Sequence, residues 1–180
     1  FTHRSADLRV MPAFDQKLAE TDCIGCGQCA AVCPTAAITV YNDIGRVWRA
    51  LHDKNKRVVF QIAPAVRVAI GEAFGLHPGE NAMGKMVAAL RLMGAAEVFD
   101  PSFAADLTTV VEAKEFMDRL KNGGTFPMFT SCCPAWVKYV EYQRPELLRH
   151  ISSCKSPMEM FAAVLRDHYE KNSDGREVYH

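Results

Sequence analysis

The hydrophobic and polar positions between residues 43 and 171 follow two alternating periods. Apolar residues three and four apart predict a series of helices, at 43–53, 65–75 with Pro64 in the first turn, 81–94, 104–123, 135–148 and 157–171. Short apolar runs predict strands at 58–62, 96–100 and 125–131. Because helices of roughly ten to fifteen residues separate these strands, we expect parallel βαβ units. The pattern therefore predicts an α/β lobe with a mainly parallel sheet.

The two ends of the chain are patterned differently. Residues 1–20 are weakly patterned, residues 36–40 (AAITV) predict a short strand, and residues 174–180 end on a further possible strand. We place a boundary between a small cysteine-rich module, residues 1–42, and the α/β lobe, residues 43–180. The chain does not begin with Met, so we expect both modules to be cut from a longer protein.

The composition excludes some partners. The chain has 180 residues, of which 49% are hydrophobic, enough to build a core. We expect the Met and Phe stripes in 83–93 and 158–164 to belong to that core. Acidic and basic residues balance at 21 each, so no bulk positive field favours nucleic acid. No apolar run is long enough to predict a membrane segment.

Four cysteines lie close together: Cys23, Cys26, Cys29 and Cys33, followed by Pro34, in the spacing C-x₂-C-x₂-C-x₃-C-P. This is the bacterial ferredoxin spacing for a 4Fe–4S cluster, and it predicts a ferredoxin-like module. A zinc site would have two separated pairs or nearby histidines, and four such cysteines rarely serve only as packing. In two-cluster ferredoxins the fourth cysteine binds the other cluster. Whether Cys33 closes the local cluster or an upstream one stays open.

Cys132 and Cys133 are adjacent, in the segment TSCCPAW that ends the strand predicted at 125–131. Neighbouring side chains point in different directions, so the two thiols are poorly placed to serve one metal together. Either both are buried packing residues or they have separate tasks. With Cys154 the chain has seven cysteines, and an odd number favours a reducing or anaerobic setting. We expect a cytoplasmic location.

The stretch FPMFTSCCPAWVKYVEYQRPELL resembles the first cluster-binding motif of the FeFe hydrogenases. The resemblance extends to ISSCKSPMEMFAA, QIAPAVRVAIGEAFG and FDPSFAADLTTVVEA, with the four-cysteine run before them. It covers nearly the whole chain. It implies an electron-relaying ferredoxin-like module joined to the first lobe of the domain that holds the H-cluster, a 4Fe–4S cluster linked to a di-iron site.

The resemblance also implies roles for single residues. It makes Cys133 a ligand of the H-cluster and Cys132 the proton donor beside it. The family's proton path corresponds here to Glu112, Ser152 and Glu115. A thiol, a hydroxyl and two carboxylates can form such a relay because each accepts one proton while donating another. Without the resemblance, the two glutamates would be a solvated helix face and Ser152 a helix cap.

Three further positions match residues that surround the family's di-iron site. Ala63 and Pro64 match its lining, and Lys155 matches a cation near its anionic ligands, although a surface lysine is the alternative. Cys154 is not at a ligand position of the family, so we expect a small buried thiol.

The resemblance leaves part of the family's site outside these residues. The other three cysteine ligands of the H-cluster come from later motifs that are absent here. We therefore expect this chain to be inactive alone and its parent to be an oxidoreductase that reversibly reduces protons to H₂. Its electrons would come from ferredoxin or another redox partner, with partner subunits possible. The alternatives are a sensory relative, an iron–sulfur assembly relative, which typically lacks the proton-donor thiol, and a plain electron carrier.

Overall fold

The computed structural model describes residues 3–7, 11–12, 14, 16–172 and 175–180. The chain divides into two compact units, which are described separately. The first contains residues 1–40 and 125–151, and the second contains residues 41–124 and 152–180. No helix in the described ranges is long and apolar enough to cross a bilayer.

The second unit is built on a parallel sheet, as the alternating pattern predicts. Its strands are β1 (Lys56–Gln61), β2 (Glu97–Phe99) and β3 (Glu177–Tyr179), in the order β2-β1-β3. Both pairings are parallel, with Val59 opposite Glu97 and Arg57 opposite Val178. The strands predicted at 58–62 and 96–100 are confirmed, and the chain's last residues do form a strand.

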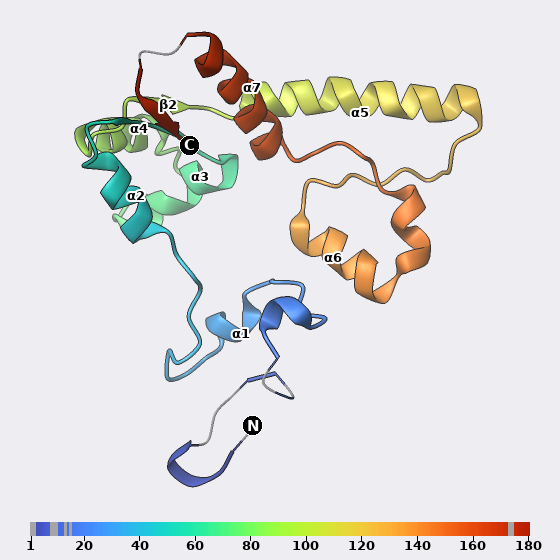
Figure 1. Ribbon diagram of the computed structural model, residues 1–180, viewed down its shortest axis with the longest axis horizontal. Helices are drawn as coiled ribbons and strands as arrows, with labels where there is room; N and C mark the ends of the chain where they lie inside the picture. The colour runs from blue at the N-terminus through green and yellow to red at the C-terminus, as the bar shows by residue number, and fades with distance from the viewer. Residues whose placement is uncertain (1–2, 8–10, 13, 15, 173–174) are drawn as a thin grey trace. The chain divides into compact units, whose positions relative to one another are not determined.

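The described residues of the second unit also form five α-helices. They are α2 (Ile44–Leu51), α3 (Pro64–Ala73), α4 (Met83–Leu92), α5 (Ser102–Asn122) and α7 (Pro157–Lys171). Each lies within a predicted helical stretch or departs from it by one or two residues. Figure 1 shows α5 extending away from the strands. Pro64 occupies the first turn of α3, where its missing N–H costs nothing.

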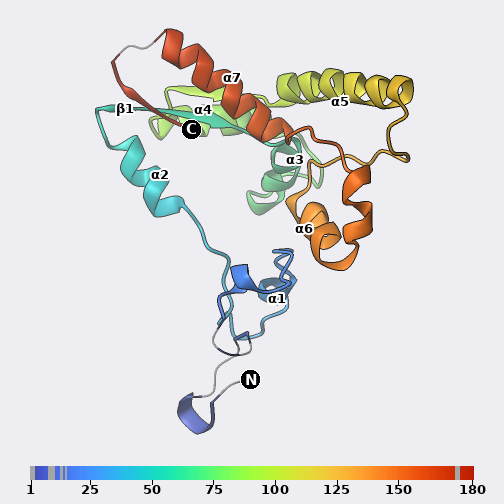
Figure 2. The same ribbon diagram turned by 45° about the vertical axis from the view of Figure 1, so that its right-hand side comes forward.

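The core of the second unit lies between the sheet, the first turn of α5 and one face of α7. Val59, Ala104, Phe161, Leu165 and Tyr169 form one buried cluster, against which Phe99 and Val178 pack. Figure 2 shows α7 passing over the strands. Phe161 packs edge to face on Phe99, with ring centroids 5.4 Å apart. Burying a side chain of this size stabilises the fold by about 1.5–3 kcal/mol.

Helix α5 ends where its Asn-Gly-Gly sequence predicts. Gly123 adopts a left-handed conformation, with φ of 73°, and its N–H donates to the Arg119 carbonyl. A residue with a Cβ would be strained there, so glycine sets the end of the helix.

The first unit has less regular structure. Its elements are η1 (Ser5–Asp7), η3 (Leu18–Glu20), α1 (Gln28–Ala31), α6 (Pro134–Gln143) and η4 (Pro145–His150). The strand predicted at 36–40 is wrong, since no strand within the described residues pairs with that stretch. The strand predicted at 125–131 is reduced to a single parallel bridge between Phe129 and Ile151. Pro127 has no N–H to extend that ladder.

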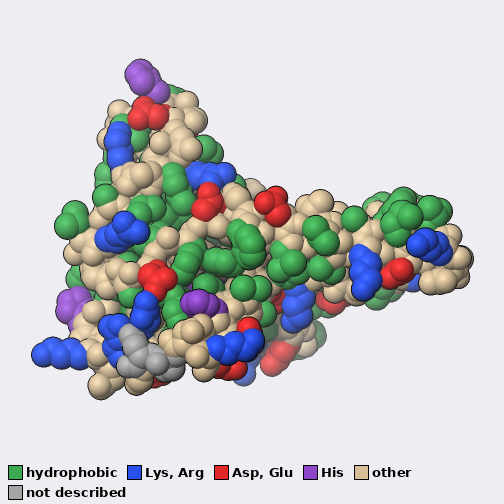
Figure 3. All heavy atoms as spheres, turned by 90° about the horizontal axis from the view of Figure 1, so that it is seen from above, with side chains coloured by type: hydrophobic (Ala, Val, Ile, Leu, Met, Phe, Trp, Pro, Cys, Tyr) green, Lys and Arg blue, Asp and Glu red, His purple; other side chains and the backbone are tan. Residues whose placement is uncertain are grey.

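Several large apolar side chains stay exposed. On α5 they include Phe103, Val110 and Leu120, each more than half exposed. Figure 3 shows apolar side chains, in green, spread over one face of the molecule. The prediction that the 83–93 stripe belongs to the core is wrong within this structure, because α4 has no buried residue. The 158–164 stripe contributes Phe161 to the core, whereas Met158 stays exposed.

Candidate iron–sulfur and proton-relay site

The four-cysteine run lies on an irregular loop around the short helix α1. Gly25 and Gly27 both have positive φ, 69° and 75°, a conformation that glycine adopts without strain. Gly27 also caps α1, which carries Cys29. Cys23, Cys26 and Cys29 are exposed free thiols, and Cys33 is partly exposed. The loop therefore keeps three closely spaced thiols accessible to iron.

Cys33 lies just after α1 and has an unusual local environment. Backbone hydrogen bonding from Ile38, followed by hydrogen bonding from Thr35, lowers the pKa of the Cys33 thiol to about 7. The Cys33 Sγ lies 3.6 Å from the Thr35 hydroxyl oxygen. Thiolates are the species that bind iron, so this environment suits a ligand.

The donor set fits an iron–sulfur cluster in its chemistry. Four thiols within eleven residues, on a loop with two left-handed glycines, are the donors that a 4Fe–4S cluster requires. The side chains are not gathered around a common point. Within the described ranges, no three His, Cys, Asp or Glu side chains lie close enough together to hold a metal ion.

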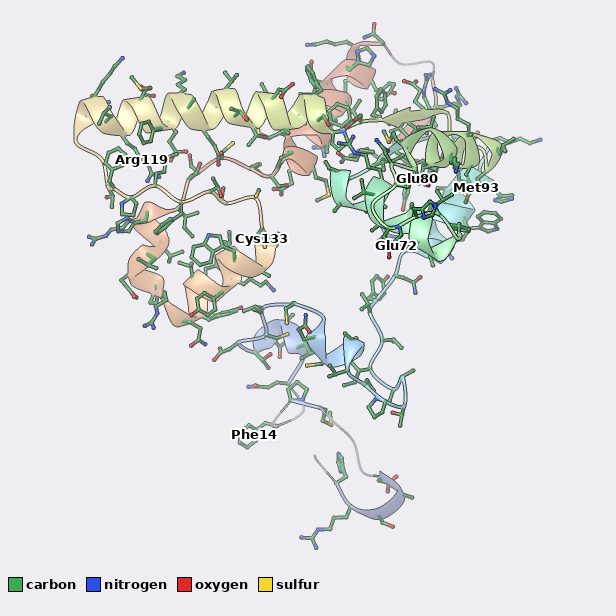
Figure 4. The ribbon with its side chains drawn as sticks, turned by 180° about the vertical axis from the view of Figure 1, so that it is seen from behind. Phe14, Glu72, Glu80, Met93, Arg119 and Cys133 are labelled. Carbon is green, nitrogen blue, oxygen red and sulfur yellow. The ribbon has the colours of Figure 1, made fainter. Side chains whose placement is uncertain are left out.

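Cys132 and Cys133 lie at the start of α6, as Figure 4 shows for Cys133. Both thiols are exposed and free, so neither is a buried packing residue. Cys133 is the N-cap residue of α6 and has an extended backbone, and Pro134 opens the helix. Behind them, Trp136 packs edge to face on Phe129, with centroids 6.1 Å apart. The helix start gives the two thiols different backbone settings, which suits separate tasks.

In the second unit, the structure brings Glu115 and Ser152 together. The Ser152 hydroxyl donates to Glu115 Oε2 at 2.7 Å, and Ser152 itself is only 5% exposed. The Ser152 oxygen also accepts from the Cys154 N–H at 3.0 Å. Ser152 therefore does not cap a helix: it ties α5 to the segment that precedes α7.

Two further residues hold the same carboxylate. Arg119 donates to Glu115 Oε1 at 2.5 Å from one turn further along α5 (Figure 4). Ser153 donates to Oε2 through its N–H at 3.1 Å and its hydroxyl at 3.2 Å. Neither Arg119 nor Ser153 was predicted from the sequence. The spacing of four between Glu115 and Arg119 is a signal that could have found the arginine.

These contacts set the charge of Glu115. Burial acts to raise the pKa of Glu115, but the hydrogen bonds from Ser152, Arg119 and Ser153 outweigh it, so the pKa is lowered. Glu115 is therefore held as a carboxylate near neutral pH. Glu112, three residues earlier on α5, is partly exposed.

Cys154 is buried, as predicted, and is 7% exposed. Its thiol lies 3.5 Å from the Met160 sulfur. Burial raises the pKa of the Cys154 thiol, and the negative charges of Glu112 and Glu115 raise it further. A neutral, buried thiol is a poor metal ligand, which agrees with leaving Cys154 out of the ligand set.

Ala63, Pro64 and Lys155 are all exposed. Ala63 is the N-cap residue of α3 and directly follows the carboxyl end of β1. The carboxyl ends of parallel strands are where open α/β sheets bind ligands. Cys132 and Cys133 belong to the first unit, and Ala63, Pro64 and Lys155 belong to the second.

The parallel sheet and the cysteine run define an iron–sulfur protein with an α/β domain. Residues 56–180 match the family "Iron only hydrogenase large subunit, C-terminal domain", and residues 18–39 match a "4Fe-4S binding domain". The first match covers more than half of the chain. The chain belongs to the iron-only hydrogenase large-subunit family.

Comparisons with individual proteins agree with this assignment. The chain is 49% identical over 166 residues to the NADP-reducing hydrogenase subunit HndD of Solidesulfovibrio fructosivorans, covering 89% of this chain and 28% of that protein. A solved structure of a variant of [FeFe]-hydrogenase HydA1 from Chlamydomonas reinhardtii is 40% identical, with a TM-score of 0.68, covering 73% of this chain and 34% of that one. Cytosolic iron-sulfur assembly component 3 of Bos taurus is 28% identical over 177 residues, covering 91% and 37%. The chain thus spans about a third of the length of these relatives.

Proposed function

We propose that this chain is part of an FeFe hydrogenase whose full-length parent catalyses the reversible reduction of two protons by two electrons to H₂. The observation that carries the proposal is the 2.7 Å hydrogen bond between Ser152 and Glu115. These two residues lie 37 positions apart, and the family resemblance had assigned both to one proton path. A solvated helix face would not place a buried hydroxyl on that glutamate.

Different cysteines bind the two kinds of cofactor. Residues 1–42 form the ferredoxin-like module, in which Cys23, Cys26, Cys29 and Cys33 hold a 4Fe–4S cluster that relays electrons. Residues 43–180 form the first lobe of the catalytic domain, and Cys133 holds the 4Fe–4S part of the H-cluster there. Ala63, Pro64 and Lys155 surround the di-iron site. When bound, the H-cluster supplies the centre at which electrons and protons combine.

The remaining residues move protons. Cys132 holds a proton at its Sγ and delivers it to the reaction. Glu112, Ser152 and Glu115 replenish it from solvent, each accepting one proton as it gives up another. The steps between Glu115 and Ser152 are supported by their hydrogen bond, and the steps through Glu112 and Cys132 by the resemblance.

The parent protein would act with other proteins. We propose ferredoxin or another redox protein as its electron partner and the cytoplasm as its location. Partner subunits are also proposed, since HndD is itself described as a subunit. A single ligand of the H-cluster cannot hold it, so the 180-residue chain is expected to be inactive by itself.

The test is hydrogen evolution from a reduced dye by the full-length parent, matured with its di-iron cofactor. The wild type should evolve hydrogen, and Cys132→Ala should keep its iron and lose nearly all activity. Cys154→Ala is the matched control, since Cys154 is a buried thiol outside the relay. A matured wild type that makes no hydrogen would favour the assembly or sensory alternative. Equal activity in Cys132→Ala would refute the proton role of that thiol.

A further inference from the structure

The outer end of the proton path lies at an open recess of about 540 Å³ in the second unit. Its wall includes Lys114, Glu115, Asp118, Arg119, Asn122 and Ser153. Glu115 contributes a side chain that is only 18% exposed. The few groups in contact with its carboxylate are therefore placed to pass protons between water and Glu115.

The groups that cover Glu115 differ in what they can do. The Arg119 guanidinium is a donor with no acceptor atom, and a backbone N–H does not exchange protons on the time scale of turnover, so neither can relay a proton. Of the groups of Arg119, Ser152 and Ser153 that donate to this carboxylate, only the two serine hydroxyls can accept one proton while giving another. Ser152 is 5% exposed, so it lies on the inner side. Ser153 is exposed, so it lies on the side of the recess.

Both hydroxyls contact the same oxygen. Ser152 lies 2.7 Å and Ser153 3.2 Å from Glu115 Oε2, while Arg119 binds Oε1. The Ser153 N–H, at 3.1 Å, fixes Oε2 between the two hydroxyls independently of either side chain. One carboxylate oxygen thus joins an exposed hydroxyl to a buried one.

We propose that the Ser153 hydroxyl is the outermost member of the proton path and passes protons between water in the recess and Glu115. The inference rests on the proposed function for its place in a reaction. Hydronium or a buffer acid protonates Ser153 Oγ as the hydroxyl proton of Ser153 moves to Glu115 Oε2. At Ser153 one O–H bond breaks and another forms. A new O–H bond forms at Glu115, and the acid loses its proton to become its conjugate base. No electrons are exchanged.

Glu115 then passes the proton inward. The Ser152 oxygen has two lone pairs, of which one accepts from the Cys154 N–H. Once Glu115 is protonated, the Ser152 hydroxyl turns its own proton away from Oε2, so that its other lone pair accepts the proton from Glu115 while the Ser152 hydroxyl proton leaves on the inner side. For hydrogen oxidation the same steps run in reverse.

The experiment compares Ser153→Ala with Ser153→Thr in the full-length parent. Alanine removes the hydroxyl but keeps the N–H that positions Glu115, and threonine restores the hydroxyl. The first readout is the rate at which Glu115 is protonated after a pH jump, which needs no turnover. The infrared band of the Glu115 carboxyl group follows this protonation, and the loss of the band in Glu115→Gln assigns it to Glu115. We expect Ser153→Ala to slow this rate at least fivefold and Ser153→Thr to stay within twofold of the wild type.

The second readout is hydrogen evolution as a function of pH. Arg119 pairs with Glu115, the charges of Glu112 and Glu115 both act on the Cys154 thiol, and Lys114 and Asp118 line the same recess; the variant changes none of these groups. We expect Ser153→Ala to lose more activity at pH 8 than at pH 6, because hydronium is scarcer at pH 8 and direct protonation is slower. Thr109→Ala, which removes an exposed hydroxyl bonded within α5, is the matched control and should be unchanged.

Three outcomes decide the proposal. A slower pH-jump rate that threonine restores supports it, even if the wild type proves to make no hydrogen and the proposed function fails. An unchanged pH-jump rate in Ser153→Ala overturns it, because water then reaches Glu115 directly. A slower rate in both Ser153 variants also overturns it, since the effect would then come from altered packing.

Discussion

The hydroxyl of Ser152 donates to the carboxylate of Glu115 at 2.7 Å, although the two residues lie 37 positions apart. Helix α5 carries the glutamate, and the segment before α7 carries the serine. The packing of α5 and α7 on the same side of the sheet, through Ala104 and Phe161, brings them together. The relay geometry is therefore a consequence of how the core is built.

Ser152→Ala should interrupt the proposed proton path without disturbing the iron sites. It removes the buried hydroxyl that donates to Glu115 and leaves the Arg119 and Ser153 contacts in place. General acid–base groups contribute about 100-fold or more to rate, so hydrogen evolution by the matured parent should fall about 100-fold. The iron content should stay at the wild-type level. Activity within twofold of the wild type would remove Ser152 from the path.

Glu115 should make stability depend on pH in the acid range. Its pKa is lowered in the fold, so its carboxylate stabilises the fold above the ordinary glutamate pKa of about 4.3. That stabilisation is lost as the pH falls through the lowered pKa. Hydrogen bonds to a charged group contribute about 1.5–3 kcal/mol, and Glu115→Gln should reduce the free energy of unfolding by a similar amount at pH 7.

Urea unfolding of the chain and of Glu115→Gln at pH 3 to 7 measures this contribution. The difference between the two proteins should be largest at pH 6–7 and should shrink towards pH 3. Asp106→Asn provides the control, since Asp106 is an exposed carboxylate on the same helix. A difference that is constant with pH would mean that the substitution acts through packing and not through charge.

The helices and central strands could be predicted because they depend on local patterns. Helical spacing and a glycine stop are visible in any short window, as at 104–123, and β1 is a β-branched run bounded by Pro64. The strands predicted at 36–40 and 125–131 depended on partners that local sequence does not show. The pattern of α4 likewise predicts a buried face, but whether that face is buried depends on which other elements pack against it.

The candidate site was predictable in its residue types and less so in its contacts. The cysteine spacing predicted the 4Fe–4S cluster, and the resemblance assigned Ser152 and Glu115 to one proton path. Nothing in the sequence indicated that Ser153 would bind the same carboxylate, because that contact depends on the path of the chain after Ile151. Arg119 could have been found from its spacing of four, but many such pairs are only surface ion pairs.

The 180-residue chain itself should bind one 4Fe–4S cluster after anaerobic reconstitution. Roughly four iron atoms per chain and a visible charge-transfer absorption are expected from the four-cysteine run. Cys26→Ser should abolish both signals, because it removes a thiol from the centre of the run. Cys154→Ser is the matched control and should keep them, since Cys154 is buried against Met160. Wild-type iron content in Cys26→Ser would mean that the run is not the binding site.

The start of α7 should contribute measurably to stability. Ser156 and Glu159 form a capping box, in which the Ser156 oxygen accepts from the Glu159 N–H and Glu159 Oε2 accepts from the Ser156 N–H, both at 3.3 Å. Ser156→Ala should lower the free energy of unfolding by about 1 kcal/mol. Phe161→Ala, which empties a buried site in the same helix, should cost about 3–5 kcal/mol.

Because α7 follows the segment that carries Ser152, its start also anchors the proposed relay. Chemical denaturation of Ser156→Ala, Glu159→Ala and the double variant should show that the two effects are not additive, since each residue satisfies the other's N–H. Ser102→Ala serves for comparison, as Ser102 donates to Asp100 at the start of α5 and contacts neither residue. Fully additive losses would show that the capping box does not act as a unit, and that Ser152 is held in place by its hydrogen bonds to Glu115 and Cys154 and not by the start of α7.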